Sequence, residues 1–148
     1  MPNTVLFICT GNYYRSRYAE LYFNVVAQKL SIDWKANSRG LDTTGGYNVG
    51  PISKFAFERL NRLNISPGDP LRFPIQLEEK DLLEAGQIIA INYVEHQPMM
   101  KKQFPVWANK ITYWEIADLN ITKANEALSA IETKVEELAT NLVKHHNQ

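Results

Sequence analysis

Four segments of the chain have the apolar patterns of β-strands. Residues 5–8 and 87–91 are nearly continuous apolar runs, which is typical of strands buried on both faces. Residues 32–36 alternate between apolar and polar side chains, which predicts a half-buried edge strand, and the turn-forming residues Ser38–Gly40 predict a loop after it. Residues 110–114 are expected to form the fourth strand.

Between these segments, apolar residues recur at intervals of three and four, which is the spacing of one helix face. The helices are expected at residues 16–30, from Pro51 to Leu63, at residues 78–84 and 94–104, and from a cap at Thr122 to Leu142. Because strands and helices alternate, the chain is expected to form an α/β fold with a parallel sheet and helices on both faces.

The composition narrows the class of protein. The chain has 148 residues, of which 45% are hydrophobic and 22% charged, so one globular domain over residues 1–148 is expected and a disordered or fibrous chain is excluded. Sixteen Lys and Arg balance sixteen Asp and Glu, so neither nucleic acid nor a membrane surface is expected as a partner. No apolar stretch reaches the roughly 20 residues that span a bilayer, and the N-terminus lacks the pattern of a secretory signal, so a cytoplasmic location is expected.

Cys9 is the only cysteine, which excludes an internal disulfide and a multi-cysteine zinc site. It ends the first predicted strand, and ligands of open parallel sheets bind beyond the carboxyl ends of the strands. A cysteine at this place is either a small core residue or a reactive thiol.

The residues after Cys9 favour a reactive thiol in a phosphate-binding loop. Five residues separate Cys9 from Arg15, and a helix is expected to start near Ser16. A short loop that closes on a helix N-terminus directs backbone N–H groups towards an anion, and Gly11 and Asn12 tolerate the left-handed backbone that this shape needs. The planar guanidinium of Arg15 matches two phosphate oxygens. The same positive surroundings stabilise a thiolate, to which Ser16 could donate a hydrogen bond.

With these residues the chain resembles the low-molecular-weight protein tyrosine phosphatases, whose motif Cys-x-Gly-Asn-x-Cys-Arg-Ser-Pro follows the first strand. The chain keeps five of the motif residues, which are Cys9, Gly11, Asn12, Arg15 and Ser16. Residues 47–50 resemble the loop in which the family places an aromatic wall for the substrate ring, here Tyr47. Residues 114–118 resemble the late loop that holds the general acid, here Asp118.

The resemblance implies a three-layer, flavodoxin-like fold with a four-stranded parallel sheet in the order 2-1-3-4. It also implies that Cys9 attacks a phosphotyrosine-type aryl phosphate to form phosphocysteine, while Asp118 protonates the leaving group and then activates water. The substrate would be a phosphorylated protein or a small aryl phosphate, and neither a metal nor a cofactor is implied. The residues implied to hold the phosphate, or another oxyanion, are Thr10, Gly11, Asn12, Tyr13, Tyr14, Arg15 and Ser16. Those implied to support the loop are Asn12, Ser16 and Ser38.

Several positions depart from the family pattern. Tyr14 stands where the family has a second cysteine, so an oxidised Cys9 is not expected to be rescued by an internal disulfide. Arg17 replaces the proline after the Arg-Ser pair and is expected to add positive charge near the site. The stretch at residues 71–74 lacks the histidine that often completes the loop-supporting network.

The late loop also departs from the pattern. Leu119 replaces the proline after Asp118, and no tyrosine pair follows, so the second aromatic wall of many members is missing. Tyr13 and Tyr14 could replace part of that wall or could pack on neighbouring helices. Tyrosine specificity therefore has weaker support than phosphatase chemistry.

Three other functions remain on the same fold. A thiol-dependent arsenate reductase is disfavoured because it would need further cysteines beside Cys9. A phosphocysteine carrier would not need a hydrolytic residue such as Asp118. A catalytically impaired module that binds phosphate or phosphotyrosine remains an alternative function.

The histidines do not form a metal-ligand set. His96 is expected on a helix surface or in local packing.

Overall fold

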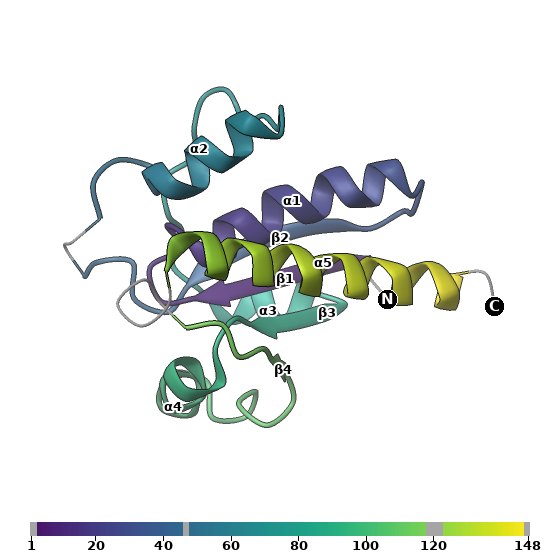
Figure 1. The fold of residues 1–148 in the computed structure, drawn as a ribbon. Coiled ribbons are helices and arrows are strands. Elements are labelled where there is room, and N and C mark those ends of the chain that lie inside the picture. The colour runs from purple at the N-terminus through teal and green to yellow at the C-terminus, as the bar shows by residue number, and fades with distance from the viewer. Residues whose placement is uncertain (1–2, 46–47, 118–122, 147–148) are drawn as a thin grey trace.

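A computed structural model describes residues 3–45, 48–117 and 123–146 (Figure 1). Strands and helices alternate along these residues, as the apolar pattern predicts. The strands are β1 (Thr4–Cys9), β2 (Lys35–Gly40), β3 (Gln87–Ala90) and β4 (Thr112–Tyr113). The helices are α1 (Arg15–Lys29), α2 (Lys54–Arg62), α3 (Glu79–Glu84), α4 (Tyr93–Gln103) and α5 (Ala124–His146).

The strands of the described residues form one parallel sheet in the order β2-β1-β3-β4, which confirms the predicted topology. β1 lies in the middle, with Cys9 opposite Gly40 of β2 and Ile8 opposite Ala90 of β3. The carboxyl ends of these three strands therefore meet at one edge of the sheet, which is where parallel sheets bind ligands.

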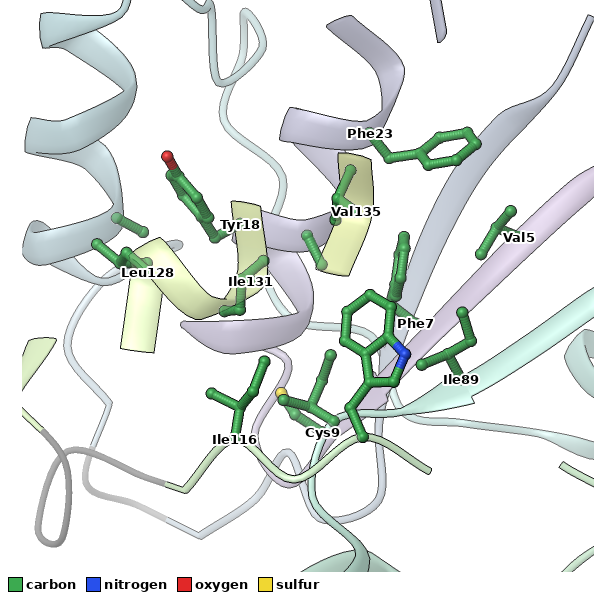
Figure 2. Packing of buried hydrophobic residues seen from close by; sticks show 14 of the residues in the cluster. Val5, Phe7, Cys9, Tyr18, Phe23, Ile89, Ile116, Leu128, Ile131 and Val135 are labelled. Atoms are coloured by element: carbon green, nitrogen blue, oxygen red, sulfur yellow. The ribbon is translucent and has the colours of Figure 1, made fainter. Parts of the chain in front are cut away.

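Side chains of β1 alternate between two apolar cores, one on each face of the sheet. Val5, Phe7 and Cys9 pack in the core that includes α1 and α5, where the ring of Phe7 meets that of Phe23 at 6.2 Å (Figure 2). Leu6 and Ile8 pack in the other core, with residues of α3 and α4. A strand with helices on both faces is apolar throughout, which explains the continuous apolar run of β1.

The prediction for the second strand is wrong in its boundaries. β2 covers Lys35–Gly40 instead of residues 32–36, so Ser38–Gly40 lie in the strand and not in a loop. Their backbones pair with Phe7–Cys9 of β1, and this pairing outweighs the turn preference of small polar residues. Ile32 lies before the strand, where its N–H bonds to the carbonyl of Ala27 at the end of α1.

The other element boundaries agree with the predicted ones to within a few residues. α2 begins at Lys54 and not at Pro51, because the side chain of Ser53 accepts a hydrogen bond from the N–H of Phe55 and so caps the helix. β4 is shorter than predicted. The expected cap Thr122 lies outside the described residues, and no helix among the described residues is long and apolar enough to cross a membrane.

Candidate active site

The loop between β1 and α1 has the geometry of an anion site. Cys9 ends β1, and Arg15 is the first residue of α1. Asn12 has a φ of 52°, so this residue, and not Gly11, adopts the left-handed backbone. No residue that the structure describes accepts a hydrogen bond from the backbone N–H groups of Gly11, Asn12 or Tyr13. These three groups are available to an oxyanion beside the N-terminus of α1.

Cys9 lies at the bottom of this loop, with only 3% of its surface exposed. Its Sγ atom is 2.9 Å from the Oγ atom of Ser16, which in turn accepts a hydrogen bond from Nδ2 of Asn12 at 2.8 Å. Because Asn12 supplies a donor to that oxygen, the hydroxyl proton of Ser16 can point at the sulfur. The contact expected between Ser16 and Cys9 is therefore present.

The guanidinium of Arg15 is almost completely buried and is held at both ends. Nη1 donates to the carbonyl of Ile116 at 2.9 Å, and Nη2 donates to Oε2 of Glu95 at 2.7 Å. Burial alone would raise the pKa of Glu95, but hydrogen bonds from His96 and Arg15 lower it to about 2. Glu95 is therefore ionised at any pH near neutral. The sequence did not predict the carbonyl of Ile116 or the carboxylate of Glu95 as partners of Arg15.

His96 is fully buried and packs locally, which is the second of the two positions expected for it. Its Nδ1 accepts the N–H of Asn92 at 3.0 Å, which leaves the ring proton on Nε2. Nε2 lies 3.1 Å from Oγ1 of Thr10 and 3.2 Å from Oε2 of Glu95. Among the described residues no group of three or more His, Cys, Asp or Glu could hold a metal ion.

A buried polar network supports the loop from the β2 side. Nδ2 of Asn12 donates to Ser38 at 2.9 Å as well as to Ser16, so these three residues lie together as predicted. Arg72 completes the network, because its Nη1 donates to Oδ1 of Asn12 at 3.0 Å and its Nη2 donates to Ser38 at 2.9 Å. Nη2 of Arg72 also pairs with Glu20 at 2.8 Å. An arginine thus occupies the stretch that lacked the expected histidine, and it provides two donors.

Arg17 does not add to the positive lining of the cleft, contrary to the prediction. Its side chain is 1% exposed, and its Nη1 donates to the carbonyl of Pro51 at 2.8 Å. Its Nε makes no hydrogen bond to a described residue. Burial, together with repulsion from Arg72, lowers the pKa of Arg17 to about 10. The side chain connects α1 to the segment before α2.

A cleft of about 930 Å³ opens above the loop. Its described lining is Cys9, Thr10, Gly11, Tyr13, Tyr14, Arg15, Asp42, Gly45, Asn48, Val49, Ser53, Lys54 and Phe55. The hydroxyl of Tyr13 donates to the carbonyl of Val49 at 2.5 Å, and that of Tyr14 donates to the carbonyl of Ala124 at 3.2 Å. Both tyrosines line the cleft. Tyr14 is also part of the apolar core.

Two residues that the sequence assigns to the site lie outside the described residues. They are the expected general acid Asp118 and the expected wall residue Tyr47. Their described neighbours do reach the site, since Asn48 lines the cleft and the carbonyl of Ile116 holds Arg15.

A parallel α/β sheet with an anion loop after its first strand defines the class of protein, a flavodoxin-like fold with an oxyanion site. The family model for low molecular weight phosphotyrosine protein phosphatases matches residues 4–148. No curated protein sequence matches the chain.

Solved structures agree with the family match. YfkJ from Bacillus subtilis is 26% identical, with a TM-score of 0.83 over 98% of this chain and 97% of that chain. A low molecular weight protein tyrosine phosphatase from T. tengcongensis is 28% identical, with a TM-score of 0.74 over 96% and 98%. The YwlE arginine phosphatase from Geobacillus stearothermophilus is 24% identical, with a TM-score of 0.77 over 97% and 95%, and shares the fold.

The chain belongs to the low molecular weight phosphotyrosine protein phosphatase family. It is therefore a phosphatase, an enzyme of the phosphoric monoester hydrolase class.

Proposed function

We propose that the protein hydrolyses aryl phosphate monoesters of the phosphotyrosine type through a phosphocysteine intermediate. The observation that carries this proposal is the placement of Cys9 at the bottom of the cleft, with its Sγ atom 2.9 Å from the hydroxyl of Ser16. The family match over residues 4–148 supports one phosphatase domain over the whole chain.

In the first step, the thiolate of Cys9 attacks phosphorus, so that an S–P bond forms while the bond from phosphorus to the aryl oxygen breaks. Asp118 gives its proton to the leaving phenolate. Backbone N–H groups of the loop and the guanidinium of Arg15 stabilise the equatorial phosphate oxygens in the transition state. The chain itself supplies the positive field, so the step needs no metal.

In the second step, water attacks the phosphocysteine. Asp118, now a carboxylate, takes a proton from this water, the S–P bond breaks, and the thiolate of Cys9 and inorganic phosphate are released. Arg15 donates to the carbonyl of Ile116, two residues before Asp118. That contact supports a position for Asp118 close to the phosphate.

Aromatic side chains support an aryl substrate. Tyr13, Tyr14 and Phe55 line the described cleft. Tyr47, the wall residue expected from the family resemblance, lies outside the described residues. Rings of this kind can stack on the ring of a substrate. Tyr13 and Tyr14 thus supply part of the wall that the missing tyrosine pair would have formed.

The proposal is tested by measuring phosphate release from an aryl phosphate with the native protein, Cys9→Ser and Asp118→Asn. Cys9→Ser is expected to abolish turnover, and Asp118→Asn to slow it by roughly 100-fold or more, because general acid catalysis is lost. A fully active Cys9→Ser protein would disprove the phosphocysteine mechanism.

Other outcomes of the same assay identify the alternatives. A native protein that binds phosphate and never turns over is a binding module, and a trapped phosphocysteine that passes to another protein and not to water is a carrier. Release of phosphate from phosphoarginine, with none from aryl phosphates, would indicate an arginine phosphatase like the YwlE enzyme. The cytoplasmic location and the absence of disulfide rescue remain predictions of the sequence.

A further inference from the structure

The first turn of α4 places two ionisable side chains behind the phosphate loop. Oε2 of Glu95 is 2.7 Å from Nη2 of Arg15 and 3.2 Å from Nε2 of His96. The carbonyl of Ile116 accepts a hydrogen bond from the other terminal nitrogen of Arg15 at 2.9 Å. With one acceptor at each end, the planar guanidinium is held in one orientation before any ligand arrives.

His96 connects this carboxylate to the loop. Its Nδ1 accepts from the backbone of Asn92, so its only ring proton lies on Nε2, between Glu95 and Oγ1 of Thr10. Thr10 follows the nucleophile directly and lines the cleft. Helix α4 therefore contacts the phosphate loop at two residues, Thr10 and Arg15.

A carboxylate is an unexpected group beside an oxyanion site. Its negative charge repels phosphate and partly cancels the charge of Arg15. Because hydrogen bonds keep Glu95 ionised, this unfavourable effect operates at every pH at which the enzyme would work. A gain from holding Arg15 rigidly is the physical effect that can outweigh it.

We propose that Glu95 and His96 are positioning residues: Glu95 orients the guanidinium of Arg15 for phosphate, and His96 holds both Glu95 and Thr10 in place. Neither residue touches the substrate, and each acts through a residue of the loop. This inference rests on the proposed function only for its kinetic consequences, because its effect on phosphate binding requires no turnover.

The test compares Glu95→Ala and Glu95→Gln with the native protein. Orthophosphate affinity is measured by calorimetry, and kcat and KM are measured for an aryl phosphate. Glu95→Ala is expected to lower phosphate affinity by about 10- to 100-fold, which is the range of a hydrogen bond to a charged group, and to lower kcat with it. Glu95→Gln should lose less, because its amide oxygen can still accept from Arg15. The matched control is Glu84→Gln on α3, an exposed residue with no ion pair in the described structure.

The sign of the change separates positioning from simple repulsion. Removal of a repelling charge alone would tighten phosphate binding, so an affinity for Glu95→Ala equal to or above the native value would overturn the proposal. If the native protein binds phosphate without turnover and Glu95→Ala weakens that binding, the proposed function fails while the positioning role stands.

A double-mutant cycle with Arg15→Lys shows whether Glu95 acts through Arg15. The loss caused by Glu95→Ala is expected to shrink to within about two-fold in the Arg15→Lys background, because the oriented group is gone. An equal loss in both backgrounds would mean that Glu95 has a merely structural role.

The role of His96 is tested by two variants at one position. The amide of His96→Gln can place an N–H near the position of Nε2, whereas His96→Leu cannot, so the Gln variant is expected to keep more phosphate affinity. Equal affinities in two folded variants would remove His96 from the proposal. Should both variants unfold, the Glu95 variants still decide whether Arg15 is positioned from α4, because Glu95 lies at the surface of α4 and is 28% exposed.

Discussion

At the scale of single residues, Asn12 shows how one side chain shapes the phosphate loop. Its left-handed backbone turns the chain, and its fully buried amide makes four hydrogen bonds. Nδ2 donates to Ser16 and Ser38, while Oδ1 accepts from Arg72 and from the N–H of Ile75. Asn12 therefore supplies both the left-handed backbone of the loop and a side-chain amide whose donor and acceptor atoms are all hydrogen-bonded.

Gly40, at the end of β2, is expected to tolerate no side chain. A Cβ atom there would lie 2.8 Å from the carbonyl oxygen of Thr10, 2.7 Å from Cγ2 of Thr43 and 3.0 Å from Cβ of Asn12. Gly40→Ala should therefore lower the free energy of unfolding by about 1–3 kcal/mol, as overpacking does, and weaken phosphate binding by displacing the loop. Urea denaturation and phosphate calorimetry measure the two effects. Gly45→Ala is the control, since its Cβ would approach no described atom closer than 4.0 Å, and equal unfolding midpoints for the two variants would refute the expected clash.

At the scale of elements, three contacts attach the segment before α2 to the phosphate loop and α1. The N–H of Ser53 donates to the carbonyl of Tyr13 at 3.0 Å. The hydroxyl of Tyr13 donates to the carbonyl of Val49 at 2.5 Å. Nη1 of Arg17 donates to the carbonyl of Pro51 at 2.8 Å. Tyr13 of the phosphate loop and Arg17 of α1 therefore hold the segment before α2 against the cleft. Arg17, which replaces the proline of the family motif, has a structural role in this contact.

Arg17→Met is expected to separate stability from substrate binding. The Nε atom of this buried arginine donates to no described residue, and burial lowers the pKa of the side chain. An apolar side chain of similar length should therefore leave the free energy of unfolding unchanged or higher. Loss of the hydrogen bond to Pro51 should raise KM for an aryl phosphate about five-fold, the value of one ordinary hydrogen bond. Steady-state kinetics and urea denaturation measure both quantities. Arg62→Met, an exposed position on α2, should change neither, and an unchanged KM for folded Arg17→Met would show that this contact does not hold the segment before α2 against the cleft.

At the scale of the whole molecule, one charged cluster joins three helices on the α1 side of the sheet. Arg59 of α2 donates to both carboxylate oxygens of Glu132 of α5, at 2.7 and 2.9 Å. The hydroxyl of Tyr18 of α1 donates to the same carboxylate at 2.5 Å. Burial raises the pKa of Glu132, but the hydrogen bonds from Arg59 and Tyr18 outweigh it and lower the pKa below its ordinary value of 4.5.

Stability is therefore expected to fall in acid. A carboxyl group with a lowered folded-state pKa stabilises the fold above its unfolded pKa, and this contribution is lost as the pH falls through the folded pKa. Glu132 and Glu95, whose pKa is lowered to about 2, both behave in this way, so the free energy of unfolding should decrease from about pH 5 towards pH 2. Urea denaturation at several pH values should show a flatter acid limb for Glu132→Gln than for the native protein. Glu137→Gln, exposed on α5, should retain the native slope, and identical slopes for both variants would exclude Glu132 as a source of the acid sensitivity.

The distribution of charge over the whole molecule differs from what its net charge indicates. Equal numbers of acidic and basic residues give no net charge, yet Arg15, backbone N–H groups and a helix N-terminus meet at one point. Arg17 and Arg72 also lie near the loop, but their guanidinium groups donate hydrogen bonds within the protein. Arg17 donates to the carbonyl of Pro51, and Arg72 donates to the side chain of Asn12.

The sequence by itself determined which segments form strands and helices of a parallel α/β fold and the loop from Cys9 to Arg15. The order of the strands was expected only from the family resemblance. These features depend on residues close together in the chain, because an apolar run, a short loop and a helix start each have a local pattern. The sequence did not determine where β2 begins and ends, since the pairing of Ser38–Gly40 with β1 overrides their turn preference.

Only the tertiary structure decided which side chains surround the loop. Glu95 is 80 positions from Arg15, and Arg72 is 60 positions from Asn12, so no local spacing could connect them. One local signal was present, because Glu95 and His96 follow a buried strand whose end lies at the ligand-binding edge of the sheet. Their use depends on which strand lies next to β1 and on which face of α4 is buried, and the packing of the whole chain sets both of these.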